Sequence, residues 1–214
     1  MRLDHVSYVT SHDQISDVVN RIGSQIGTAF VDGGIHPKFG TRNFTAPLLD
    51  GKYIEIVCPL DHPATEATPF GRAVKKKADE GGGWMTWVIA VQDMAFIETV
   101  LKRNSVIGTR RKPDGSELNW KQIGVLEVIE DSKTPFFIQW ISENHPSMDG
   151  NAVAHLQKIV FQGKPSELFF QLNLEDQLIL SGTKLIWEES NTKEITSGIN
   201  CIEIEFKNKS IKLF

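Results

Sequence analysis

The chain has little of what would place it in a specialised class of protein. Its 214 residues include only two cysteines, Cys58 and Cys201, too few for a disulfide framework or a cysteine metal site. No apolar run approaches the roughly 18 residues that a membrane-spanning helix needs, and the sequence does not open on an apolar signal segment. We therefore expect a cytoplasmic protein with no membrane partner.

A concentrated charge of one sign is also missing. The formal net charge is −4, and the basic residues are scattered apart from the cluster at 75–77. Proteins that bind nucleic acid usually carry a basic patch or stripe, so we expect no nucleic-acid partner. A hydrophobic content of 40% and a charged content of 23% are ordinary for a globular chain of one large or two small domains.

Two segments of the chain carry similar strands with similar endings. Residues 52–57 run into Asp-His-Pro, and residues 136–141 run into Asn-His-Pro. Each is preceded by another strand-like segment, and His5 to Glu55 spans 50 positions where Trp87 to Gln139 spans 52. The pattern indicates an internal duplication with a site where the two copies meet.

The segments between these strands complete the two copies. Apolar residues at helical spacing predict a helix at about 12–26, with a capping box formed by Ser11 and Gln14. Two short strands are expected within 35–49, before the hairpin turn at Asp50-Gly51. The order is strand, helix and three strands, and the second copy repeats it after a glycine-rich connector at 61–83 that includes a short basic helix.

Several motifs together resemble a known family. The Leu-Asp-His-Val opening at 3–6, the Gly-Ile-His-Pro-Lys-Phe-Gly-Thr-Arg-Asn segment at 34–43 and the strand that carries Glu55 resemble the vicinal oxygen chelate superfamily, in its bacterial glyoxalase-like branch. The resemblance implies an α+β fold in which paired βαβββ modules form a cupped half-barrel sheet. The modules are expected at 1–60 and 84–146 of a glyoxalase-like domain spanning 1–146. A partial third module at 147–214, with the order strand, helix and strands, is expected to extend it.

The family resemblance also implies a metal site at the mouth of the sheet. Carried over position by position, its four ligand positions fall on His5, Glu55, Trp87 and Gln139. Trp87 has no lone pair to give, and Gln139 offers only a neutral carbonyl oxygen. His5, Glu55 and Gln139 would hold a divalent ion such as Mn²⁺, Zn²⁺, Fe²⁺ or Ni²⁺ weakly and with several waters. The alternative, also left open, is a cup that has lost its metal.

Substrate contacts are expected from both copies. In the first copy they are His36, Arg42 and Asn43, with surface-loop or backbone-capping roles as the alternative. In the second copy Arg111, and also Arg110, would line the opposite wall. Trp87 and Trp120 would add aromatic surface, although a tryptophan in a strand often belongs to the core.

Two kinds of function remain compatible with this set of residues. The first is a small-molecule enzyme acting on adjacent substrate oxygens: an isomerase, a lyase or a ring-cleaving dioxygenase. In it Glu55 would ligate metal or act as a base, and His5 would ligate or orient. The second is a metal-free protein that binds or sequesters a small ligand, which an aromatic residue at position 87 would favour. A homodimer is left open.

Overall fold

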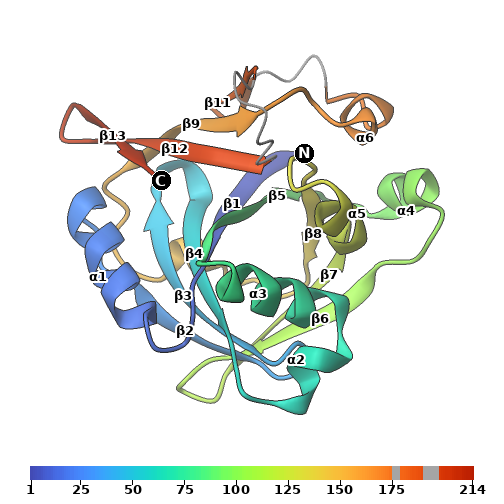
Figure 1. Cartoon of the computed structure of the whole chain (residues 1–214), viewed down its shortest axis with the longest axis horizontal. Helices are drawn as coiled ribbons and strands as arrows, with labels where there is room; N and C mark the ends of the chain where they lie inside the picture. Colours follow the sequence, from blue (N-terminus) through green and yellow to red (C-terminus); the bar gives the residue numbers. More distant parts are fainter. Residues whose placement is uncertain (175–178, 190–197) are drawn as a thin grey trace.

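Two sheets and six α-helices make up the computed structural model, which describes residues 1–174, 179–189 and 198–214. Eight strands form a closed barrel in the order β1-β4-β3-β2-β6-β7-β8-β5, and five more form an outer sheet in the order β10-β11-β9-β12-β13 (Figure 1). The predicted α+β class and curled sheet of paired modules are confirmed, and the sheet closes further than the expected half-barrel.

The first module has the predicted order of elements. They are β1 (Arg2–Val9), α1 (Ile15–Ile26), β2 (Val31–His36), β3 (Thr41–Leu48) and β4 (Lys52–Pro59). The helix begins at Ile15, and Gln14 at its N-terminus makes no side-chain capping bond, so the predicted capping box does not form. The connector holds α2 (Pro63–Ala67) and α3 (Pro69–Asp79), where a single short helix was expected.

The second module repeats the first with one addition. It comprises β5 (Gly83–Ala90), α4 (Ala95–Leu101), β6 (Val106–Arg111), β7 (Glu117–Ile123), α5 (Val125–Glu130) and β8 (Phe136–Trp140). The sequence pattern did not predict α5. In each module the first and last strands are parallel neighbours, β1 with β4 and β5 with β8, while β1 and β5 join the modules antiparallel. The other junction, between β2 and β6, has a single residue pair, Ile35 with Arg111.

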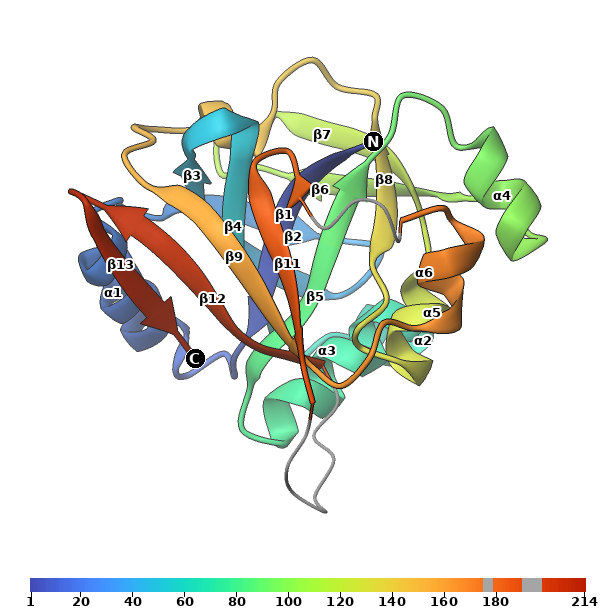
Figure 2. The ribbon, with the colours of Figure 1, turned by 90° about the horizontal axis from the view of Figure 1, so that it is seen from above.

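The C-terminal segment forms a separate layer and does not extend the barrel sheet. Its elements are β9 (His155–Gln162), α6 (Glu167–Gln171), β10 (Ile179–Leu180), β11 (Thr183–Glu188), β12 (Gly198–Phe206) and β13 (Lys209–Leu213). Figure 2 shows this sheet lying across β1 and β5. The sheet is mixed, since β9 and β11 run parallel. The domain division at residue 146 stays a prediction.

Two groups of buried apolar side chains result from the alternation of residues along the barrel strands. One packs the outer face of the barrel against α1 and the outer sheet, and includes Trp87, Phe137 and Ile202. The other fills the barrel interior and includes Val88 and Phe136, with Val74 of α3 closing one end. One strand therefore serves two cores, because successive side chains point to opposite faces.

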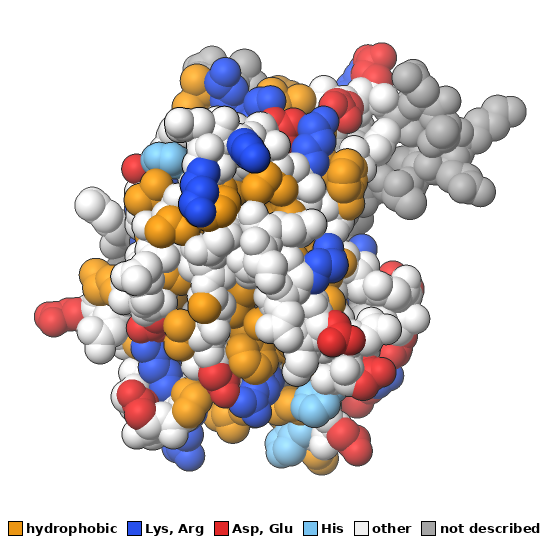
Figure 3. Space-filling model, turned by 90° about the vertical axis from the view of Figure 1, so that its left-hand side faces the viewer, with side chains coloured by type: hydrophobic (Ala, Val, Ile, Leu, Met, Phe, Trp, Pro, Cys, Tyr) orange, Lys and Arg blue, Asp and Glu red, His pale blue; other side chains and the backbone are white. Residues whose placement is uncertain are grey.

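The surface carries charges of both signs. Figure 3 shows one face on which basic and acidic side chains are separated by uncharged ones. Several ion pairs join opposite charges, for example Lys112 with Asp149 at 2.8 Å. No helix in the described part of the chain is both long enough and apolar enough to cross a bilayer.

Candidate active site

Strands β1 and β4 carry His5 and Glu55, the two predicted catalytic residues, on the face that points into the barrel. In this parallel pair His5 lies beside Tyr53, and Ser7 lies beside Glu55. Their neighbours Val6, Ile54 and Ile56 point outward into the other core. Because side chains alternate, a site at His5 and Glu55 also includes the positions two residues away on each strand.

An irregularity in β1 gives His5 a carboxylate partner. The register between β1 and β5 shifts between Leu3 and His5, so Asp4 is an extra residue in the strand, a bulge. The Asp4 side chain is fully buried, and its Oδ2 lies 2.9 Å from Nδ1 of His5. An ionised carboxylate only accepts hydrogen bonds, so Nδ1 of His5 carries a proton and donates it to this bond. In the neutral imidazole, Nε2 is then left free to accept a proton.

Asp4 is held in its ionised form by several donors. Arg2 lies 2.7 Å from Oδ1, His145 lies 3.1 Å from the same oxygen, and Trp140 Nε1 is 3.3 Å from both oxygens. Burial by itself would raise the pKa of Asp4, but the hydrogen bonds and charges of His145 and His5 outweigh it and hold the pKa far below its usual value. The His-Pro ending noted in the sequence thus contributes to the site through His145.

Glu55 is also held as an anion, by different partners. Ser7 donates to Oε2 at 2.6 Å, and Asn43 Nδ2 donates to Oε1 at 2.6 Å. His5 Nε2 lies 3.9 Å from Oε2. Burial would raise the pKa of Glu55, yet the imidazoles of His5 and His36, when protonated, and the two hydrogen bonds together lower it. Glu55 is consequently a weak base at neutral pH.

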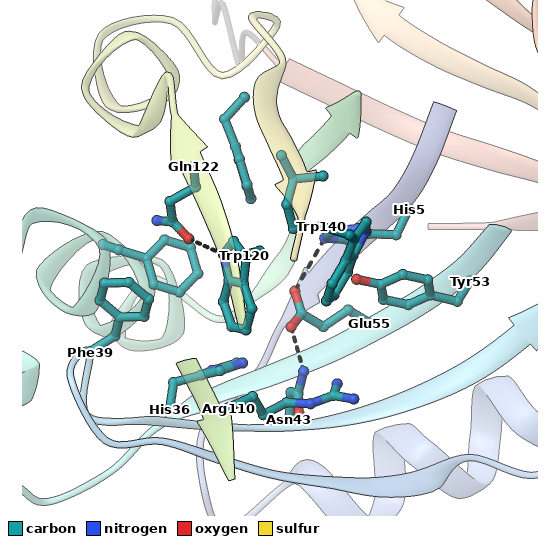
Figure 4. A pocket seen from close by; sticks show the side chains of 13 residues that line it. His5, His36, Phe39, Asn43, Tyr53, Glu55, Arg110, Trp120, Gln122 and Trp140 are labelled. Atoms are coloured by element: carbon teal, nitrogen blue, oxygen red, sulfur yellow. Dashed lines mark hydrogen bonds and ion pairs between the residues drawn. The ribbon is translucent and has the colours of Figure 1, made fainter. Parts of the chain in front are cut away.

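His5, Asn43 and Glu55 line one narrow pocket inside the barrel, with a cavity volume of about 30 Å³. Figure 4 shows Glu55 and His5 on one side, with Trp120, Gln122 and Phe39 on the other. Further aromatic rings come from Tyr53, Trp140, Phe70 and Phe136. The lining therefore combines a small polar cluster with broad aromatic walls, as small-molecule sites usually do.

Four of the predicted substrate contacts lie in this pocket. They are His36, Asn43, Arg110 and Trp120. His36 Nδ1 is 2.8 Å from Thr41 Oγ1, and burial, with a smaller effect of the Arg110 charge, lowers the pKa of His36 to about 4 despite the opposing charge of Glu55. His36 is therefore neutral at neutral pH.

Two of the three predicted arginine contacts, Arg42 and Arg111, lie outside the pocket. Arg42 pairs with Asp32 and stacks over Phe44, while Arg111 pairs with Glu117 at 3.1 Å. Both predictions are corrected for the same reason, because successive residues of a strand face opposite sides of the sheet. Asn43 next to Arg42, and Arg110 next to Arg111, are the residues that face the pocket.

Trp87 and Gln139, which were predicted at two of the four ligand positions, likewise lie one residue away from the positions that face inward. Trp87 is fully buried on the outer face of the barrel, against Phe161 and Phe169, and its Nε1 donates to the Lys133 carbonyl. Gln139 donates to the carbonyl of Gln92 and does not line the pocket. The register prediction that paired Glu55 with Gln139 is therefore wrong.

The inward positions of the second module are Val88 and Ile138. Val88 is the partner of His5 across β1 and β5, and Ile138 lines the pocket. These two residues are 50 positions apart, the same interval as His5 and Glu55. The duplicated spacing is thus conserved within the chain, but the second copy places two apolar side chains where the first places a histidine and a carboxylate.

The side chains present do not fit the metal site that the family resemblance implies. Two of its four positions are apolar, Gln139 points outward, and both Glu55 oxygens already accept hydrogen bonds. Within residues 1–174, 179–189 and 198–214, no three His, Cys, Asp or Glu side chains come together as metal ligands. The divalent ion predicted at His5, Glu55 and Gln139 therefore lacks its third ligand.

Several residues that line the pocket or contact its polar groups were not predicted from the sequence. Tyr53 precedes Glu55 by two positions and Ser7 follows His5 by two, so strand alternation alone would have found both. Gln122 could have been found by the same parity along β7, starting from Trp120. Asp4 could not, because a bulge breaks the alternation that sequence arguments use.

Comparisons with known proteins place the chain in a family. Residues 3–173 match the model of the glyoxalase-like domain, and the chain belongs to that family. The predicted resemblance to the glyoxalase-like branch of the vicinal oxygen chelate superfamily is thereby confirmed. No curated protein sequence matches the chain.

Solved structures show a more distant likeness. Methylmalonyl-CoA epimerase from Mycobacterium tuberculosis is 16% identical with a TM-score of 0.43, covering 65% of this chain and 86% of its own. The Streptomyces coelicolor enzyme, in complex with 2-nitronate-propionyl-CoA, is 15% identical with a TM-score of 0.43 and coverages of 67% and 99%. A hypothetical protein from Bacillus halodurans is 15% identical with a TM-score of 0.42 and coverages of 67% and 96%.

Proposed function

We propose that the pocket is the active site of a small-molecule enzyme that transfers a proton without a metal, as an isomerase or lyase does at a carbon next to a carbonyl. The observation that carries the proposal is the hydrogen bond of 2.9 Å between Asp4 and Nδ1 of His5. It directs the Nδ1–H of His5 to Asp4 and leaves Nε2, on the side of Glu55, as the nitrogen that can take up a proton.

The roles of the two predicted catalytic residues follow from their surroundings. A general base works best when its pKa lies near the operating pH, and the lowered pKa of Glu55 makes this carboxylate a poor one. His5 is therefore the base. Glu55 and Asp4 flank its imidazole, at 3.9 and 2.9 Å, and both carboxylates stabilise the positive charge that His5 gains when it takes the proton.

Ring cleavage is not part of the proposal, because an extradiol reaction needs a metal with open positions and the donor set here supplies too few ligands.

A second candidate function is metal-free binding of a small planar ligand. The aromatic lining favours it, since Trp120 and Trp140 lie with ring centroids 5.6 Å apart and both face the pocket. Binding without any proton exchange would identify this function.

Proton exchange in D₂O tests the proposal directly. The protein would be incubated with small carbonyl compounds, among them pyruvate, and loss of the signal of protons next to the carbonyl followed by ¹H NMR. We expect exchange that falls by about 10²- to 10⁴-fold in His5→Gln. The matched control is His155→Gln, which changes an exposed histidine of the outer sheet. Exchange that His5→Gln leaves intact, or that no carbonyl compound shows, would contradict the proposal.

A further inference from the structure

The pocket contains a buried arginine with an unused hydrogen-bonding edge. Arg110 is 2% exposed and lines the pocket from β6. Its Nε and Nη2 atoms are buried and have no hydrogen-bond partner, and no acidic side chain in the described part of the chain forms an ion pair with it. By contrast, Arg42 and Arg111 are both paired with carboxylates.

The two unpaired atoms share one side of the guanidinium group. The N–H bonds of Nε and Nη2 point in parallel and form a fork that matches the two oxygens of a carboxylate. A buried cation without a partner is costly, and proteins retain such groups where a ligand or a reaction uses them. The unpaired edge is therefore the part of Arg110 that has the geometry to hold a bidentate oxyanion.

Neighbouring residues make room for this arginine. A Cβ atom on Gly33 would lie 2.9 Å from Nη1 of Arg110 and 2.2 Å from Oδ1 of Asn43, so only glycine fits there without displacing them. Figure 4 shows Arg110 beside Asn43, below Glu55. Arg110 is thus positioned next to the residue that donates to Glu55, at the junction of the two modules.

Glu55 does not neutralise Arg110. Its two oxygens accept hydrogen bonds from Ser7 and Asn43, and no ion pair joins it to the arginine. His36 and Tyr53, two other titratable groups that interact with Arg110, carry no charge at neutral pH, because the pKa of His36 is lowered to about 4 and burial raises that of Tyr53 well above its usual value. Within the described part of the chain, the positive charge of Arg110 is accordingly not neutralised by an ion pair.

We propose that Arg110 binds the carboxylate of the substrate, which makes the substrate a small 2-oxo acid whose carbonyl and carboxylate are adjacent. The 2-oxo group in this inference rests on the proposed function, in which a proton is removed next to a carbonyl. The carboxylate rests on Arg110 alone. The guanidinium supplies the positive charge that pairs with adjacent oxygens in a pocket whose donor set does not fit a metal.

The test measures binding separately from proton exchange. Oxalate, pyruvate, acetate and inorganic phosphate would be titrated into the full chain in the presence of EDTA, using the fluorescence of pocket tryptophans and calorimetry. We expect oxalate and pyruvate to bind more tightly than acetate and phosphate. Arg110→Met should weaken oxalate binding about 10- to 100-fold, and Arg110→Lys, which keeps the charge and loses the fork, should weaken it less.

Two controls separate a ligand-binding role from a structural one. Arg111→Met, one residue along the strand and outside the pocket, should leave oxalate binding unchanged. Arg110→Met should unfold at the same or a higher temperature, because it removes an unpaired buried charge. A lower unfolding temperature together with unchanged oxalate binding would overturn the inference, as would tighter binding of phosphate than of oxalate.

The failure of the inference and of the proposed function can be told apart. Oxalate binding that depends on Arg110, in a protein that exchanges no protons of pyruvate, would support the carboxylate site and remove the enzymatic function. Proton exchange that depends on His5 but not on Arg110 would support the enzymatic function and contradict the carboxylate site. Oxalate binding should survive in His5→Gln.

Discussion

Ser7 lies directly opposite Glu55 in the parallel pair of β1 and β4, and its hydroxyl donates a hydrogen bond of 2.6 Å to Oε2 of Glu55. The same strand face presents His5 two residues earlier. One strand therefore supplies both the group that fixes the charge of Glu55 and the group that we assign as the base.

We expect Ser7→Ala to raise the pKa of Glu55 and to lower stability by about 1.5–3 kcal/mol, because a buried carboxylate loses a hydrogen bond. The lowered pKa of Glu55 adds stability at pH values above its usual pKa of 4.5, and this stability is lost as the pH falls through the folded-state pKa. Carbon NMR titration of Glu55 and urea unfolding measure the two effects. Ser16→Ala, at an exposed position in α1, is the control; an unchanged Glu55 pKa in Ser7→Ala would contradict the prediction.

His36 should make stability depend on pH between about 6.5 and 4. Its pKa is about 4 in the folded chain against 6.5 for a free histidine, so the unfolded chain binds more protons in this range. The free energy of unfolding should fall by about 3 kcal/mol as the pH drops from 6.5 to 4. Urea unfolding at several pH values measures this, and a slope that His36→Gln leaves unchanged would refute the assignment.

Trp87 should matter for stability and not for ligand binding. It is fully buried between the barrel and the outer sheet, so Trp87→Ala should lower the free energy of unfolding by about 3–5 kcal/mol. Trp87→Phe keeps most of the packing and should cost less. Oxalate affinity of the folded fraction, measured by calorimetry, should match that of the parent chain; a loss comparable to that of Arg110→Met would mean that Trp87 reaches the pocket.

A metal site should be obtainable by completing the four inward positions. The double variant Val88→His with Ile138→Glu adds two ligands opposite His5 and Glu55, and we expect it to bind Mn²⁺ or Zn²⁺ more tightly than the parent chain. Gln139→Glu, one residue further and facing outward, should gain nothing. Metal titration with elemental analysis decides between these outcomes, and the gain should disappear when Glu55→Gln is added to the double variant.

The sequence determined the modular plan of the molecule. Apolar alternation and repeated spacing predicted two copies of strand, helix and three strands, and placed His5 and Glu55 on neighbouring strands of one sheet. These predictions succeeded because hydrophobic periodicity and turn formation depend on residues that are close together in the sequence. The third unit, with its strand, helix and strands, was visible for the same reason.

Tertiary structure decided which face each residue of the second module presents. Trp87, Gln139 and Arg111 each lie one position from an inward residue, Val88, Ile138 and Arg110 respectively. A shift of one residue moves a side chain to the other face of a sheet, and where both faces are buried, as here, hydrophobicity does not mark the inner one. The outer sheet buries Trp87, and the bulge at Asp4 turns a second carboxylate toward His5. Both depend on contacts between distant segments, which only the folded chain brings together.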